Sequence, residues 1–190
     1  MLEEHVVKSM THLELREIAV TDWEMIQRIG ELRVRAWRTV VPQAVEMTVW
    51  LDDFDRTARH WAFLRDGEPV AAARLSVHKA IEEVPDPESY TGVFRNPPPA
   101  PIASLNRLVV DPAVRGMGLS EKLDLIRLAA AEAMGCKCVV GATAAGERRV
   151  RQMLKWGFVV VGEGKRCLNP PLCYMPPPLV LICYLPRKVT

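Results

Sequence analysis

Residues 109–123, VVDPAVRGMGLSEKL, place an arginine and two glycines between a β-branched run and a segment with helical periodicity. The first N–H groups of a helix have no partner inside the helix and carry the positive end of its dipole. Gly116 and Gly118 would leave these N–H groups uncovered, and the Arg115 guanidinium matches the geometry of phosphate oxygens. The pattern predicts a turn that binds pyrophosphate. The alternative is a tight strand-to-helix turn with an incidental arginine. The sequence has neither the Gly-Lys-Ser/Thr of a P-loop nor the third glycine of the dinucleotide fingerprint.

A second group of charged residues precedes this turn in the chain. Asp52 and Asp55 lie in a short acidic stretch, and Arg74 and Arg107 fall in predicted strands. Carboxylates can orient a cationic amine or relay its proton through water, and arginines can hold those carboxylates or bind a carboxylate of a substrate. The group therefore supplies candidate catalytic residues. The alternative is a solvated turn of aspartates with surface arginines.

The elements that must position these residues can be read from periodicity and turn residues. Strands are expected at residues 12–18, on both sides of the Asp66-Gly67-Glu68 turn, and at 103–110, 137–141, 158–161 and 179–185. Helices are expected from an Asp22 cap to residue 37, and at 42–51, 118–134 and 147–156. Proline-rich loops at 84–101 and 169–178 interrupt them and are expected to shape a substrate pocket.

This order predicts a single-domain α/β fold. Antiparallel N-terminal strands are followed by a strand–helix–strand unit, which makes a central parallel pair in one mixed sheet with flanking helices. The apolar final strand, LVLICYL, is expected at a sheet edge, where it can pair with a second subunit as a homodimer.

Composition excludes several classes of protein. The 190 residues are 49% hydrophobic and 25% charged, with a net charge of +2, so neither nucleic acid nor a membrane surface is expected as a partner. The N-terminus has no apolar signal core, and the five cysteines form no disulfide framework or zinc motif, so we expect a cytoplasmic protein without a metal.

The segment Arg115-Gly116-Met117-Gly118-Leu119-Ser120 resembles the Arg/Gln-x-x-Gly-x-Gly/Ala signature of the GNAT acetyltransferase superfamily. Residues 102–163 follow the pattern of that family, including a "GF" pair at Gly157-Phe158. The resemblance implies one acyltransferase domain over residues 1–190: 12–101 with the N-terminal strands, helices and proline-rich loop, 102–163 as the acyl-CoA-binding core, and 164–190 with the C-terminal loop and strand.

The resemblance also implies which residues bind coenzyme A. The backbone of Leu108, Val109 and Val110 would pair with the pantetheine arm. The amides of Arg115, Gly116, Met117, Gly118, Leu119 and Ser120 would hold the pyrophosphate. In the basic helix, Arg148 or Arg149 would contact the 3′-phosphate or an acidic acyl carrier protein. The alternative for these arginines is a solvated helix face.

The sequence departs from the superfamily where the chemistry is usually carried. Met153 stands where a tyrosine is common, Gly146 where an asparagine is common, and the strand at Ser104–Arg107 lacks the usual acid. Tyr174, in a proline-rich loop, is therefore a candidate catalytic acid, with Tyr90 and Tyr184 as the other tyrosines.

A second resemblance is to acyl-homoserine-lactone synthases and related N-acyl amino acid synthases. Residues 51–76 are similar to a segment of that branch in which Asp-x-x-Asp precedes a hairpin ending in Arg-Leu. This spacing fits Asp52 and Asp55, and Arg107 matches an arginine of the branch's strand, whereas the glutamate of the branch falls at Ser104. The early ELRVRAW, residues 31–37, is similar to its arginine-containing helix.

Together these resemblances imply an N-acyltransferase that moves an acyl group, acetyl first of all, from acetyl-CoA or another acyl-CoA to a primary amine. Direct attack in a ternary complex is expected, with a small-molecule amine or an amino-acid-like compound as acceptor. One alternative is an N-acyl amino acid or homoserine-lactone-type synthase that uses long-chain acyl-CoA or acyl carrier protein. The other is a non-catalytic acyl-CoA-binding module.

Overall fold

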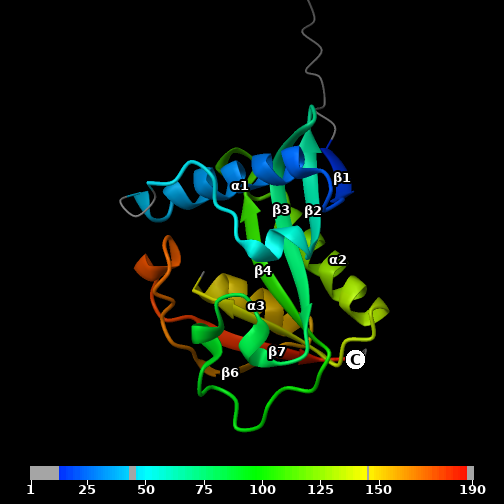
Figure 1. Cartoon of the computed structure of the whole chain (residues 1–190), viewed down its shortest axis with the longest axis vertical. Helices are drawn as coiled ribbons and strands as arrows, with labels where there is room; N and C mark the ends of the chain where they lie inside the picture. The colour runs from blue at the N-terminus through cyan, green and yellow to red at the C-terminus, as the bar shows by residue number, and fades with distance from the viewer. Residues whose placement is uncertain (1–12, 43–45, 145, 188–190) are drawn as a thin grey trace, which may run out of the picture.

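The computed structural model describes residues 13–42, 46–144 and 146–187. In these residues seven strands form one sheet in the order β1-β2-β3-β4-β5-β7-β6 (Figure 1). The strands are β1 (Leu13–Ile18), β2 (Arg59–Arg65), β3 (Glu68–His78), β4 (Ile102–Val110), β5 (Cys138–Thr143), β6 (Val159–Glu163) and β7 (Leu179–Tyr184). The α-helices are α1 (Trp23–Arg38), α2 (Leu119–Ala133) and α3 (Glu147–Lys155), and the 3₁₀ helices are η2 (Asp53–Arg56), η3 (Ile81–Glu83), η4 (Pro87–Tyr90), η5 (Pro112–Val114) and η6 (Leu172–Tyr174). None of the helices in the described residues is long and apolar enough to cross a membrane.

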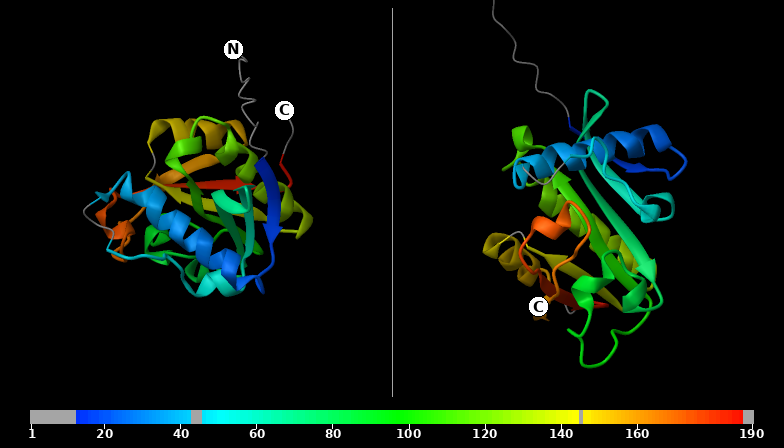
Figure 2. Two further views of the ribbon diagram at one scale, coloured as in Figure 1. Left: turned by 90° about the horizontal axis from the view of Figure 1, so that it is seen from above. Right: turned by 60° about the vertical axis from the view of Figure 1, so that its left-hand side comes forward.

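The helices cover both faces of the sheet because neighbouring strand residues point to opposite sides. In β2, Trp61 and Phe63 belong to the core cluster that contains the apolar face of α2, whereas Ala62 and Leu64 pack with α1. The helices α1 and α2 thus lie on opposite faces (Figure 2). The predicted α/β fold with a mixed sheet is confirmed, and the Asp22 side chain caps α1 as predicted, accepting a hydrogen bond from the Met25 N–H.

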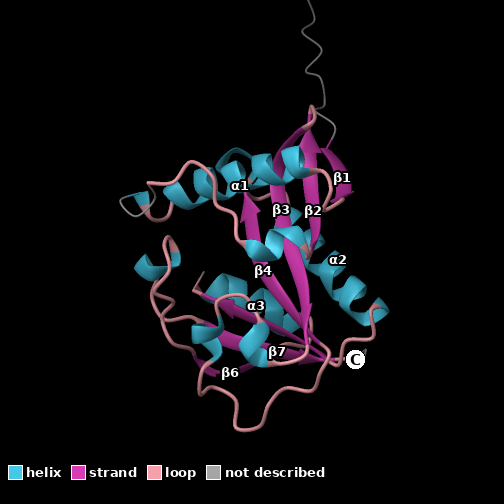
Figure 3. Cartoon of the chain, viewed as in Figure 1, coloured by secondary structure: helices cyan, strands magenta, loops and turns pink. Residues whose placement is uncertain are grey.

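The parallel pair at the centre of the sheet is short. Strands β4 and β5 pair only from Ile102↔Cys138 to Ser104↔Val140, and beyond Ser104 the strand β4 is paired with β3 alone. The two halves of the sheet then diverge, and the segment that contains η6 lies at the open side (Figure 3). The backbone edge of β4 that faces β5 is therefore left without a strand partner over residues 105–110.

A β-bulge reshapes β4 in this same region. The register between β3 and β4 shifts between Ala72 and Arg74, and Arg107 has a left-handed backbone with φ +52°. The buried Arg127 of α2 donates from Nη1 to the carbonyls of Arg74 and Asn106, at 3.0 and 3.2 Å. The helix α2 thereby holds both strands at the bulge.

The helix predicted for residues 42–51 is wrong for the residues that the structure describes; residues 43–45 lie outside them. Residues 46–51 form no helix. They cross over α1, where the Trp50 N–H donates to the Gly30 carbonyl at 3.2 Å. A Cβ on Gly30 would lie 2.7 Å from Val49 Cγ1, so the segment and α1 are in close contact. This contact fixes a non-helical path that sequence periodicity could not show.

The prediction that the final strand lies at a sheet edge is also wrong. Strand β7 pairs with β5 on one side and with β6 on the other, so its hydrogen-bonding groups are used within the chain. The last strand in sequence inserts between two earlier ones, which apolar composition alone does not reveal. The argument for a homodimer through this strand therefore fails, and a homodimer itself stays a prediction.

Candidate active site

The glycine turn, residues 115–120, has the backbone that its composition predicted. Gly116 and Gly118 have φ values of +89° and +73°, a region that favours glycine, and Gly118 is the N-cap of α2. A Cβ at either position would meet no atom within 4 Å. The space in front of the first N–H groups of α2 is therefore open, as a phosphate-binding turn requires.

Arg115 joins this turn to the end of α1. Its Nη2 donates to Thr39 Oγ1 at 2.9 Å and to the Ala36 carbonyl at 3.4 Å. Arg115 also lines the cavity described next, whereas residues 116–120 do not, so the glycine turn adjoins the cavity at Arg115.

The cavity occupies the opening between β4 and β5 and has a volume of about 710 Å³. Its walls include residues 105–110 of β4 and 141–143 of β5, so the predicted cofactor-binding residues Leu108, Val109 and Val110 all line it. Trp37, Trp50 and the loop residues Leu172 and Met175 add an apolar wall. A slot with one free strand edge and apolar sides can take an extended amide-containing chain.

Asp52 and Asp55, which the sequence marked as catalytic candidates, form a capping box around η2. The Asp52 side chain accepts from the Phe54 N–H, and the Asp55 side chain accepts from the Asp52 N–H at 2.9 Å. Their spacing of three residues is thus the spacing of a structural motif. Neither residue lines the cavity.

Asp55 is fully buried and held by two arginines. Arg33 binds both of its carboxylate oxygens at 2.8 and 2.9 Å, and Arg74 Nη1 lies 2.9 Å from Oδ1. Burial alone would raise the pKa of Asp55, but the hydrogen bond and charge of Arg33, together with Arg74, hold it well below its usual range. The structure thus places Asp55 as an ionised carboxylate that ties α1 to β3, away from the cavity.

Arg107 extends this network to the cavity wall. Its Nε and Nη2 donate to Asp52 Oδ2 at 3.2 and 2.8 Å, and its Nη1 donates to Asp86 Oδ2 at 2.8 Å. The guanidinium also lies over the ring of Trp50, 4.5 Å from its centroid. We call the six residues Arg33, Asp52, Asp55, Arg74, Asp86 and Arg107 the charge cluster.

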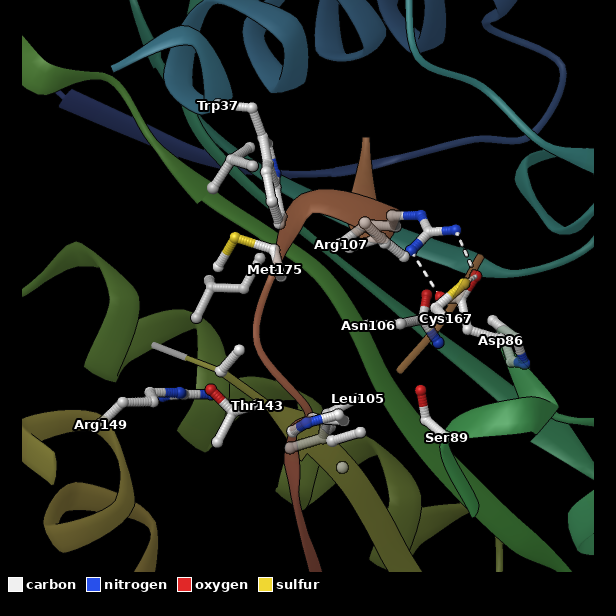
Figure 4. A pocket seen from close by; sticks show the side chains of 18 of the residues that line it. Trp37, Asp86, Ser89, Leu105, Asn106, Arg107, Thr143, Arg149, Cys167 and Met175 are labelled. Atoms are coloured by element: carbon white, nitrogen blue, oxygen red, sulfur yellow. Dashed lines mark hydrogen bonds and ion pairs between the residues drawn. The ribbon is translucent and has the colours of Figure 1, made fainter. Parts of the chain in front are cut away.

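Asp86, like Arg33, is a member of the charge cluster that was not among the residues predicted for the site. It lies in the proline-rich loop just before η4 and is the one carboxylate among the described residues that line the cavity. Figure 4 shows Asp86, Arg107 and Cys167 together on one side of the cavity, across from Thr143 and Arg149. The one local signal at this position is the Asp-Pro pair in a long loop. Such a pair is typical of a turn, so it did not indicate a functional site.

Arg148 and Arg149 have different surroundings. Arg149 lines the cavity and is ion-paired with the buried Asp124, which also binds Arg127. Arg148 is exposed at the first turn of α3. Of the two, Arg148 is the side chain that remains at the surface without an ion-pair partner among the described residues.

The structure does not bring Tyr174 into the cavity. It is 56% exposed at the end of η6, whereas its neighbour Met175 lines the cavity wall. Tyr90 does line the cavity, but it is buried, and burial raises its pKa well above the usual range. Met153, at the position where the superfamily often has tyrosine, lies at the cavity floor with Leu105 and Gly141.

Comparisons with known proteins identify a family with this fold. The family model described as "Acetyltransferase (GNAT) family" matches residues 14–158. Among curated proteins, nothing matches the sequence significantly.

Solved structures share the fold at low identity. An N-acetyltransferase from Staphylococcus aureus Mu50 is 15% identical, with a TM-score of 0.59 over 92% of this chain and 99% of the other. The AHL synthase LasI is 16% identical, with a TM-score of 0.60 over 90% of both chains. The putative acetyltransferase yncA from Salmonella typhimurium, solved with its cofactor acetyl-CoA, is 13% identical, with a TM-score of 0.59 over 94% of this chain and 97% of the other. The glycine turn, the divergent central strands and the family match together show that this chain belongs to the GNAT acetyltransferase family.

Proposed function

We propose that this protein transfers a short acyl group, acetyl first of all, from coenzyme A to a primary amine by direct attack in a ternary complex. The observation that carries the proposal is one cavity that borders both the residues predicted to bind coenzyme A and a carboxylate that could bind the amine. It runs along the free edge of β4, reaches the glycine turn through Arg115, and reaches Asp86 on its other wall. Holding both substrates in one cavity supplies much of the rate of a transfer reaction.

The residues around the opening fit coenzyme A. The N–H groups at the start of α2 would bind the pyrophosphate, and Arg115 would add a positive charge beside it. The unpaired edge of β4 at Leu108–Val110 would bind the amide groups of pantetheine. Arg148 would serve the 3′-phosphate from the surface of α3. When bound, acyl-coenzyme A would supply the acyl group as a thioester, and coenzyme A would leave as the free thiol.

The floor of the cavity supports a short acyl group. Leu105 and Met153 line it and belong to the same core cluster as Val139, Phe158 and Leu181, which are at most 2% exposed and do not line the cavity. A Cβ on Gly141 would already lie 3.2 Å from Met153 Cε, so this end is closely packed. A long acyl chain would need a channel through this core, which makes the long-chain synthase the weaker candidate.

The first test is thermal unfolding of the purified protein with coenzyme A, acetyl-CoA and palmitoyl-CoA. A ligand at one hundred times its dissociation constant adds about 2.7 kcal/mol of stability, which a melting curve resolves. We expect acetyl-CoA and coenzyme A to raise the melting temperature, and release of free thiol from acetyl-CoA to require an added amine. Stabilisation by palmitoyl-CoA above that by acetyl-CoA would favour the long-chain alternative. Binding without turnover on any amine would favour a non-catalytic module.

A further inference from the structure

Two residues with a left-handed backbone are ion-paired in the wall of the cavity. In the described chain, three residues other than glycine have a left-handed backbone: Asp66, Asp86 and Arg107. Asp66 belongs to the β2–β3 turn, where this conformation is ordinary. Asp86 (φ +57°) and Arg107 (φ +52°) are ion-pair partners, and both line the cavity. Backbone strain of this kind persists where surrounding structure holds it, and it concentrates at functional sites.

Arg107 has little remaining capacity to bind a ligand. Its Nε and Nη2 face Asp52, its Nη1 faces Asp86, and its side chain is 8% exposed beneath Trp50. A substrate carboxylate would therefore compete with Asp52 and Asp86 for this guanidinium. Arg107 is therefore a positioning residue for Asp86.

Asp86 has the opposite character. Its Oδ2 accepts from Arg107 at 2.8 Å, but its Oδ1 lies 3.4 Å from Arg107 Nη2 and 4.0 Å from the Cys167 sulfur, both long contacts. A carboxylate has about four acceptor sites, so Oδ1 can accept from a ligand. The side chain is 20% exposed, and the other charged residues that line the cavity are all arginines. A protonated or neutral amine in this cavity finds its negative partner at Asp86.

The surroundings of Asp86 describe the rest of the ligand. The wall that leads away from it is made of Trp37, Trp50, Leu172, Met175 and Pro176. Trp37 and Met175 project toward one another in this part of the cavity (Figure 4). These side chains favour an apolar or aromatic body and offer no positive partner for a carboxylate.

We propose that Asp86 binds and orients the amino group of the acceptor, and that the acceptor is a primary amine on an apolar or aromatic body without a carboxylate beside the amine. The proposal rests on the acyl transfer proposed above. It excludes free α-amino acids as preferred acceptors, because their carboxylate would lie beside Asp86, and the nearby cation Arg107 is already paired with Asp52 and Asp86.

The test uses matched acceptors and matched variants. Acetylation of phenethylamine and phenylalanine amide is compared with that of phenylalanine, by thiol release from acetyl-CoA. We expect the two acceptors without a carboxylate to have kcat/KM at least tenfold above phenylalanine. In D86N the asparagine oxygen can still accept from Arg107, and we expect KM for phenethylamine to rise at least tenfold while KM for acetyl-CoA is unchanged. Glu82→Gln, at an exposed position of η3 just before the proline-rich loop, removes the same charge outside the cavity and is expected to behave as the parent.

The outcomes separate this proposal from the one it rests on. If the parent protein does not bind acetyl-CoA, the proposed acyl transfer itself fails. If it binds acetyl-CoA but phenylalanine is acetylated as well as its amide, or none of the three acceptors is acetylated, the acceptor proposal is overturned alone. Equal kinetics for D86N and E82Q would also overturn it. Should D86N not fold, the comparison of acceptors with the parent protein still decides.

Discussion

The two glycines of the glycine turn have the backbone conformation expected of a phosphate-binding turn. Gly116 and Gly118 adopt left-handed backbones although no neighbouring atom would collide with a side chain there. Crowding within the chain therefore does not explain the glycines. The left-handed backbone, together with the open space at the start of α2, explains why glycine stands at these positions.

We expect Gly118→Ala to weaken coenzyme A binding at least tenfold, since a methyl group would stand before the first N–H groups of α2. Gly135→Ala is the matched control: Gly135 lies just beyond the other end of α2, has nearly the same φ (+72°), and also has open space at Cβ. Both variants should lose about 1 to 2 kcal/mol of stability from the left-handed backbone. Calorimetric titration with coenzyme A, together with urea unfolding, measures both effects. Equal affinities in the two variants would contradict the phosphate-binding role of the turn.

At the scale of elements, the divergence of β4 from β5 creates the cavity, and α3 closes its floor. Met153 of α3 packs against Gly141 of β5 and lines the cavity beside Leu105 of β4. The depth available to an acyl group is therefore set by the contact between a helix and two strands.

Shortening Met153 should deepen this end of the cavity. We expect Met153→Ala to raise the ratio of kcat/KM for hexanoyl-CoA to that for acetyl-CoA at least tenfold. Met25→Ala is the matched control, because Met25 is buried between α1 and the sheet and does not line the cavity. Removal of either side chain costs about 2 to 5 kcal/mol of stability, so the assays are run at low temperature. An unchanged ratio in Met153→Ala would show that the floor does not select the acyl group.

At the scale of the whole molecule, the charge cluster connects parts of the chain that are distant in sequence. Arg33 comes from α1, Arg74 from β3 and Arg107 from β4, while the aspartates come from η2 and the proline-rich loop. His60 of β2 lies against this cluster, with Nε2 donating to the Asp55 carbonyl at 3.1 Å. Burial lowers the pKa of His60 to about 4.

This burial makes stability fall as pH falls. Above the unfolded-state pKa of 6.5, His60 is neutral in both states and has no effect; between pH 6.5 and about 4 only the unfolded state takes up a proton. The resulting loss approaches about 3 kcal/mol by pH 4, and protonation of Asp55 adds to it at lower pH.

We expect His60→Gln to remove most of the slope of unfolding free energy between pH 7 and 4.5, measured by urea unfolding at several pH values. His78 has a lowered pKa as well, through burial, and its ring bonds Ser76 Oγ at 2.8 Å, so His78→Gln should remove a smaller part. Equal slopes in the parent and in His60→Gln would contradict this account.

The sequence by itself determined the features that depend on local chemistry. Periodicity and turn residues gave the α/β fold and the hairpin at Asp66-Gly67, and the glycine spacing gave the turn that opens α2, because each depends on residues close together in the chain. Tertiary structure decided what depends on packing between distant segments: the path of residues 46–51 over Gly30, the insertion of β7 between β5 and β6, and the burial of Asp55 beneath Arg33. It also decided which carboxylate reaches the cavity. Asp52 and Asp55 had the more suggestive spacing, but the bulge at Arg107 and the path of the proline-rich loop bring Asp86 to the cavity wall instead. Asp86 and Arg107 are far apart in the sequence, so no local pattern could predict that they meet.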